Sequence, residues 1–131
     1  MGTWGVGTFE NDAASDWVYD LEKVRDLSVV QSALAAINQS HELLDARSCE
    51  NALAASEVVA ALLGKPTAYL PENVARWVEA NARLPRAELR DASLGAIEKI
   101  VSDSELRDLW AETDDLENWE TSVRDLQSRL S

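Results

Sequence analysis

Apolar residues recur at intervals of three and four positions along most of the chain, and this spacing predicts α-helices. No segment shows the sustained two-residue alternation between hairpin turns that predicts β-strands. The predicted fold class is therefore all-α, a compact bundle of about six or seven helices. The apolar positions that define it include Ala14, Trp17, Leu21 and Val24, then Val30, Leu34 and Ile37, then Val74, Trp77 and Val78, and then Leu89, Ala92, Ala96 and Ile100.

Residues that favour helix ends place the boundaries of these helices. The third helix is predicted over about 49–63, because Gly64 and Pro66 follow it and a polar loop or broken helix spans 39–47. The predicted N-terminal residues are Asn11 or Asp12 for the first helix, Ser28 with Gln31 as a capping box for the second, Pro71 and Pro85 in the first turns of the fourth and fifth, and Ser102 with Glu105 as a capping box for the sixth.

Two of the predicted helices have distinct packing roles. The third is rich in alanine, and small side chains let neighbouring helices approach closely, so we expect it at the centre of the bundle. The last helix carries apolar residues at steps of 3, 4, 3 and 4, an a/d seam that we expect to bury within the chain, with a homodimer as the minority alternative. The seam residues are Leu116, Trp119, Val123, Leu126 and Leu130.

The first ten residues differ from the rest of the chain. Three of the five glycines lie here, interleaved with Trp4 and Phe9, so the segment is predicted to be extended rather than helical. We expect it to act as an N-terminal clasp (residues 1–10) that packs both aromatic rings, largely buried, onto the bundle formed by residues 11–131. The length of 131 residues fits one domain over 1–131.

Charge excludes several classes of function. The chain has 24 acidic and 12 basic side chains, a net charge of −12, which argues against nucleic-acid and anionic-membrane partners. The acids gather at both ends of the chain. A single cysteine, Cys49, fits a reducing compartment, and the N-terminus shows no secretory signal, so a cytoplasmic location is expected.

The N-terminal sequence resembles the opening motif of one bacterial family, a domain of unknown function named DUF4259. The matching residues are Gly2, Trp4, Gly5, Gly7, Phe9, Asn11, Asp12, Ala14, Asp16 and Trp17. Weaker likeness covers the alanine-rich stretch around Glu57, where family members commonly have alanine at the position of Ser56, and the stretch from Asp103 to Trp110. The resemblance implies one domain, a bacterial source and a cytoplasmic setting, and it implies no activity.

Several groups of residues are candidates for chemistry. The glycines at positions 2, 5 and 7 are compatible with a phosphate cradle, but the nearby acids and the absence of a base before Lys23 favour a structural clasp. Glu57, predicted to be buried, requires a partner: a tryptophan N–H, an arginine or the backbone of the N-terminal segment, so it is interpreted as a polar pin rather than a catalytic acid. Carboxylate pairs at helical spacing suit Mg²⁺ or Mn²⁺, although solvated helix faces explain them better: Asp12 with Asp16, Glu88 with Asp91, Glu105 with Asp108 and Glu117 with Glu120.

Two further groups are weighed in the same way. Cys49 and His41 are eight residues apart without an oxyanion motif, so Cys49 is interpreted as a small packed residue rather than a nucleophile. The basic residues are expected either to face an acidic partner or, as the favoured alternative, to pair with the acidic last helix; they are Arg76, Arg83, Arg86 and Arg90.

The sequence therefore favours a small acidic bacterial protein that is a non-enzymatic protein-binding or regulatory module. No catalytic, cofactor-binding or metal-binding residue is assigned, and no cofactor is implied. An immunity- or antitoxin-like inhibitor that offers an acidic surface to a toxin is one alternative. A metal-dependent hydrolase built on helix carboxylates is the other. A concave cluster of carboxylates favours the hydrolase, whereas a broad acidic surface with an apolar centre favours the inhibitor.

Overall fold

The computed structural model describes residues 5–83 and 87–131. Within these residues the chain forms helices and connecting loops and no β-strand, so the predicted all-α fold is confirmed. None of the described helices is long and apolar enough to cross a membrane. The helices are α1 (Asp12–Glu22), α2 (Ser28–Asn38), α3 (Ala46–Leu62), α4 (Glu72–Ala80), α5 (Ala87–Ser102), α6 (Glu105–Ala111) and α7 (Leu116–Leu130).

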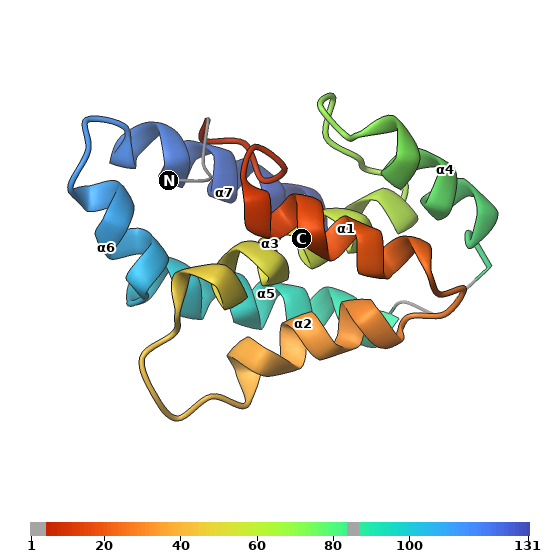
Figure 1. The fold of residues 1–131 in the computed structure, drawn as a ribbon, viewed down its shortest axis with the longest axis horizontal. Helices are drawn as coiled ribbons and strands as arrows, with labels where there is room; N and C mark the ends of the chain where they lie inside the picture. Colours follow the sequence, from red (N-terminus) through yellow and green to blue (C-terminus); the bar gives the residue numbers. More distant parts are fainter. Residues whose placement is uncertain (1–4, 84–86) are drawn as a thin grey trace.

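Helix α3 is the centre of the bundle, as its alanine content predicts. It contacts all six other helices, and they surround it in Figure 1. Its residues from Ala52 to Leu62 are all buried, because alanine and valine side chains let α2 and α5 approach closely. The helix ends at Leu62, and Gly64 follows the C-cap Leu63 with a φ of 88°, in the left-handed region that glycine adopts at low cost.

Helix α7 closes the bundle through the predicted seam. Trp119, Val123, Leu126 and Leu130 are 3% exposed or less, and the helix packs against α3, α5 and α6. Leu116, the first position of the seam, is only partly buried. The apolar face of α7 is thus buried by this chain's own core.

Three predicted helix starts were wrong. Ser28 does not cap α2: it is the first helical residue, and its N–H and hydroxyl both donate to Asp26. The predicted box at Ser102 is also absent, because α5 continues to Ser102 and the hydroxyl of Ser104 caps α6 instead. Helix α3 begins a turn earlier than expected, at Ala46, because Asp45 accepts a hydrogen bond from the N–H of Ser48.

The predicted place of Pro71 was closer to the observed start of its helix. Pro71 precedes α4 directly, one position before the first turn where it was predicted. Pro85 lies outside the described residues. Asn11 rather than Asp12 is the N-cap of α1, and its Oδ1 accepts from the N–H of Ala14 at 2.7 Å.

Candidate functional site

The buried carboxylate of Glu57 forms an ion pair with Arg129, so an arginine is the main partner among the three kinds expected. Nη1 of Arg129 lies 2.9 Å from Oε1 of Glu57, and Nη2 lies 3.0 Å from Oε2. Their side chains are 16% and 4% exposed. The hydrogen bond to Glu57 raises the pKa of Arg129 above its ordinary value, against the opposing effect of burial.

Further contacts hold this pair in place and join three parts of the chain. Nε of Arg129 donates to Asp125 one turn earlier in α7, at 2.9 Å, and Nη1 donates to the carbonyl of Lys65 just after α3. The hydroxyl of Thr8 donates to Glu57 at 3.4 Å, which attaches the N-terminal segment to the same carboxylate. Arg129 and Thr8 therefore satisfy the carboxylate of Glu57, and Asp125 and the carbonyl of Lys65 satisfy the guanidinium of Arg129. Neither charge is left alone, which would be costly for a buried group.

A cavity of about 740 Å³ opens beside this ion pair, between the N-terminal segment and α7. Its polar side chains include Thr67, Asn118, Thr121 and Ser122, and the ring of Tyr69, 89% exposed, lies at its edge. Three carboxylates also line it, but Glu57 and Asp125 are both bound by Arg129. This leaves Glu10 as the one carboxylate of the cavity without a bonded cation in the described residues.

Gly5 and Gly7 of the motif leave room for the side chain of Glu10. Gly5 and Gly7 both have negative or extended φ, and a Cβ at either position would collide with the carboxylate of Glu10. The N–H of Gly7 donates to Oε1 of Glu10 at 3.1 Å. The exposed carboxylate of Glu10 thus accepts from the N–H of Gly7, one of the donors that a phosphate cradle would offer to a ligand, which supports the structural interpretation of Gly5 and Gly7.

The other motif residues spread over α1 and the segment before it. Phe9 was expected to be largely buried and is only partly buried, because it covers the edge of the core instead of entering it. Trp17 is buried, at 5% exposed. Gly2 and Trp4, including the expected burial of Trp4, fall outside the described residues.

The paired carboxylates do not converge. Asp12 and Asp16 are exposed. The carboxylate of Asp16 forms an ion pair with Arg47 at 3.1 Å. Among residues 5–83 and 87–131, no three Asp, Glu, His or Cys side chains are placed to hold a metal ion together. Glu105 has a structural contact that the sequence did not predict: its carboxylate accepts from the N–H of Ala46 at the start of α3.

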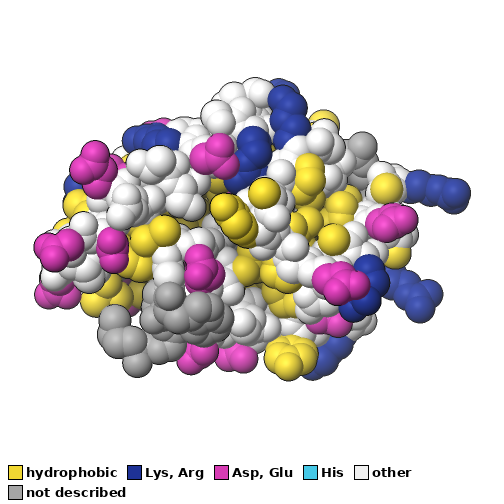
Figure 2. All heavy atoms as spheres, turned by 90° about the horizontal axis from the view of Figure 1, so that it is seen from above, with side chains coloured by type: hydrophobic (Ala, Val, Ile, Leu, Met, Phe, Trp, Pro, Cys, Tyr) yellow, Lys and Arg dark blue, Asp and Glu magenta, His cyan; other side chains and the backbone are white. Residues whose placement is uncertain are grey.

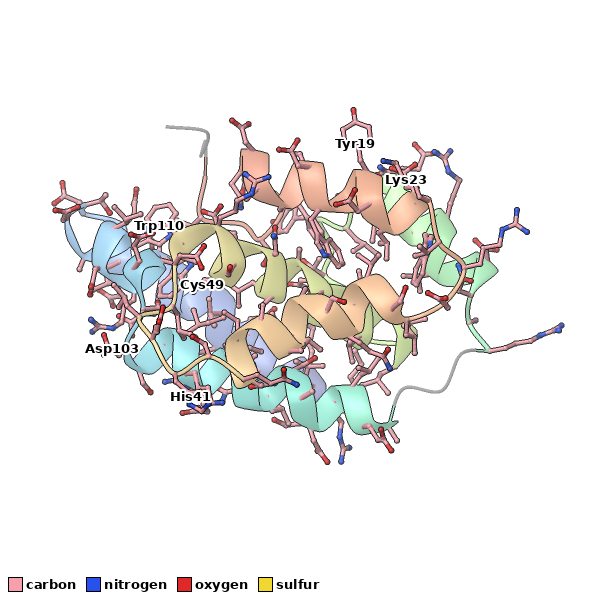
Figure 3. The ribbon with its side chains drawn as sticks, turned by 60° about the horizontal axis from the view of Figure 1, so that its bottom comes forward. Tyr19, Lys23, His41, Cys49, Asp103 and Trp110 are labelled. Carbon is pink, nitrogen blue, oxygen red and sulfur yellow. The ribbon has the colours of Figure 1, made fainter. Side chains whose placement is uncertain are left out.

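Cys49 and His41 are also apart. In Figure 3, His41 lies on the loop between α2 and α3 at the outer edge of the molecule, whereas Cys49 is fully buried on α3. Burial raises the pKa of the Cys49 thiol to about 12. A thiol with this pKa is not the reactive thiolate that nucleophilic catalysis requires.

The expected pairing of the arginines with the last helix was wrong for Arg76 and Arg90. Arg76 pairs with Glu72 one turn away in its own helix, and Arg90 pairs with its neighbour Asp91. Both pairs are exposed and local, and neither involves a residue of α7. Arg86 lies outside the described residues.

Glu50 has a carboxylate with a shifted pKa, and the sequence pattern did not identify it as a candidate residue. It is half-buried on α3, two turns before Glu57, and it lines a narrow space beneath Gly5 and Gly7. Burial raises its pKa from 4.5 to about 6; the charge of Arg47 opposes this rise, and the charge of Asp12 adds to it. A raised native pKa means that the folded state favours the protonated form.

Replacing Glu50 with glutamine is therefore expected to stabilise the fold at neutral pH. In the parent, the contribution of Glu50 to stability is greatest below its ordinary pKa of 4.5 and falls as the pH rises through about 6. Glutamine stays neutral, so Glu50→Gln should gain about 1 kcal/mol at pH 7 and nothing at pH 4, a gain limited by solvent screening. Urea unfolding across this pH range measures it. The exposed Glu42→Gln serves as the control, and an equal gain in both variants would contradict the assignment.

The end formed by α6 and the start of α7 is strongly acidic. From Asp103 to Glu120 there are eight carboxylates and one basic residue, Arg107. In the part of the chain that the structure describes, none of these eight forms an ion pair. Figure 2 shows several acidic side chains at this end and Lys and Arg side chains that project from the opposite end.

Apolar side chains lie among these carboxylates. Leu109 is 41% exposed, and Trp110 and Leu116 are partly buried at the junction of α6 and α7. Trp110 marks this corner in Figure 3. The surface therefore combines an apolar centre with an acidic surround, an arrangement found at protein interfaces.

Comparison with known proteins yields one match. A family model described as "Domain of unknown function (DUF4259)" matches residues 2–122. No curated protein and no solved structure matches the chain. The matched range includes the opening motif and Glu57, and it ends before Arg129.

Proposed function

The chain belongs to the DUF4259 family, and on that premise we propose that it is a non-enzymatic module that binds a basic protein partner through the acidic end formed by α6 and the start of α7. The observation that carries this proposal is the set of unpaired carboxylates between Asp103 and Glu120 around the exposed side chain of Leu109. These acids are available to a partner because no cation of the described chain neutralises them.

The electrostatics of this end suit association with a cationic surface. Like charges crowded at one end raise the local potential, which accelerates the encounter with an oppositely charged protein and weakens as salt is added. The exposed Leu109 supplies apolar area at the centre, where desolvated contacts contribute most of the binding energy. The charge therefore accelerates the encounter with the partner, and the apolar side chains at the junction of α6 and α7 stabilise the complex.

The described residues offer less support for an enzyme. Two of the three carboxylates that line the cavity beside α7, Glu57 and Asp125, are held by Arg129, and the one cysteine is buried with a raised pKa. A metal-dependent hydrolase needs several carboxylates that converge on one ion. In the described part of the chain, no three carboxylate, histidine or cysteine side chains converge in this way, so we do not propose the hydrolase.

Neutralising the acidic end tests the proposal. A variant with Glu112→Gln, Asp114→Asn and Glu117→Gln should lose at least tenfold in affinity for partners captured by the parent chain, since charged contacts set encounter and specificity. The matched control, Glu42→Gln with Glu79→Gln and Asp91→Asn, removes the same charge from exposed positions elsewhere. Capture is quantified at low and physiological salt. Equal retention by both variants would reject the acidic end as the contact surface.

An immunity- or antitoxin-like role is the second candidate, supported by the same apolar centre within an acidic surround. In that case the partner is itself a basic enzyme, and binding covers its catalytic surface. Adding the purified chain should then inhibit the captured partner's activity in proportion to the complex formed. A partner that stays fully active in the complex would leave the chain as a binding module without inhibitory function.

A further inference from the structure

The cavity beside the Glu57–Arg129 ion pair has no role in the proposed function, which uses the acidic end. Its volume of about 740 Å³ is in the range of small-molecule sites. The N-terminal segment, the loop between α3 and α4, and α7 form its walls, and Figure 1 shows that segment beside α7. The cavity is therefore large enough for a small ligand and is bounded by three separate parts of the chain.

One face of α7 gives the cavity a polar wall. Its lining residues Asn118, Ser122, Asp125 and Arg129 follow one another at steps of 4, 3 and 4, so they share one face of the helix. None of the four belongs to the apolar seam, which is buried against the core on an adjacent face. The core contacts of α7 therefore leave this polar face directed at the cavity.

Two carboxylates of the lining are accessible to a ligand. The side chain of Asp125 is 64% exposed, although its Oδ2 accepts from Arg129, and Glu10 is also exposed. The carboxylate of Glu57, by contrast, is 4% exposed and is occupied by Arg129 and Thr8. Recognition of a ligand therefore falls to Glu10 and Asp125 and not to the buried ion pair.

The charge of the lining favours a cation. Three carboxylates and one guanidinium line the cavity, which gives a net charge of −2. The guanidinium of Arg129 already donates to Glu57, to Asp125 and to the carbonyl of Lys65, so it offers little attraction to an anion. A cleft lined by an excess of one sign of charge concentrates ions of the opposite sign. A positively charged ligand therefore finds a counter-charge here, whereas an anion is repelled.

Two hydroxyl groups of the lining offer a ligand acceptors only. Thr8 donates its hydroxyl proton to Glu57 at 3.4 Å, and Thr121 donates its own to the carbonyl of Glu117 at 2.9 Å. The oxygen of each hydroxyl keeps lone pairs that accept from an N–H donor, and an ammonium group has donors and no acceptor. A divalent metal ion fits less well, because no three Asp, Glu, His or Cys side chains in residues 5–83 and 87–131 are placed to hold one.

We infer that this cavity binds a small organic ammonium ion that carries an apolar group. The carboxylates of Glu10 and Asp125 supply the negative charge that attracts it, and hydroxyl oxygens of the walls accept from its N–H groups. Phe9 and Tyr69 line the same cavity, and aromatic rings attract cations and cover apolar surface. The inference does not rest on the acidic end, so either site can fail without the other.

Benzylammonium, benzyl alcohol and benzoate test the charge preference, because each has one aromatic ring and they are positive, neutral and negative. In ¹⁵N-labelled full-length protein, benzylammonium should shift the backbone amide signals of Gly7 and Ser122 saturably, with a dissociation constant in the millimolar range expected of a ligand this small. Benzyl alcohol should bind about tenfold more weakly, because it has no charge to pair with the carboxylates. Benzoate should cause no saturable shift.

Three variants test the place of binding. Glu10→Gln should weaken benzylammonium binding about fivefold, the effect of one accessible counter-charge. The triple variant that neutralises the acidic end removes more charge, but outside the cavity, and should stay within about twofold of the parent at physiological salt. Ser122→Leu narrows the cavity and should weaken binding, whereas Ser128→Leu, at an exposed position of α7 outside the lining, should not. Circular dichroism checks that each variant is folded.

Three results would overturn the inference. One is equal affinity for benzylammonium and benzyl alcohol, which would remove the role of charge. Another is a loss of affinity in the acidic-end variant as large as that in Glu10→Gln, which would show that binding follows only the net charge of the chain. The third is equal binding by the Ser122→Leu and Ser128→Leu variants, which would place the probe outside the cavity.

Discussion

Replacing Arg129 with methionine is expected to lower the free energy of unfolding by about 3 kcal/mol. The substitution leaves the carboxylate of Glu57, 4% exposed, without its bidentate partner. Within the described residues, only the hydroxyl of Thr8 then remains to bond it, at 3.4 Å. Chemical denaturation monitored by circular dichroism measures the loss.

Two comparisons separate the buried charge from a simple loss of packing. Arg124 lies on the same helix and pairs with Glu98 at the surface, so Arg124→Met should change stability by less than about 1 kcal/mol. Combining Arg129→Met with Glu57→Gln should recover part of the loss, since glutamine carries no charge to leave uncompensated. A loss no larger than that of Arg124→Met, with no recovery in the double variant, would show that the ion pair contributes little.

The helical periodicity was sufficient to predict the class of fold, because burial of apolar faces decides it. The alanine content of α3 was sufficient to predict its central place, because small side chains let neighbouring helices approach closely. The helix starts were less predictable. Ser102 with Glu105 has the spacing of a capping box, yet Glu105 bonds the start of α3 and Ser104 takes over the cap. A carboxylate that finds a partner 59 residues away in the chain leaves no trace in the local pattern.

The same limit applies to the sites. That Glu57 needs a partner followed from its apolar surroundings, but the sequence did not identify Arg129, 72 residues away. The one local signal for Arg129 was Asp125, four residues earlier and therefore on the same helix face. Long-range pairings of this kind require the three-dimensional fold.

The second large effect is expected at the seam of α7, where Val123→Glu should unfold the protein or cost more than about 4 kcal/mol. Val123 is 3% exposed within a helix face that packs on α3 and α5, so a carboxylate there is buried without a cation or a hydrogen-bond donor. Ser128→Glu adds the same charge at an exposed position of the helix and should change stability by less than about 1 kcal/mol. Thermal unfolding of both variants measures the difference.

Sedimentation of the same variants shows where the seam belongs. If the apolar face of α7 packed mainly against a second copy, the parent would be a dimer and Val123→Glu would yield folded monomers. We expect instead a monomeric parent and an unfolded variant, because the chain's own helices already bury Trp119, Val123 and Leu126. The opposite face of α7 then remains open at Glu117, adjoining the acidic end proposed for partner binding, whereas Asp125 is already bound by Arg129.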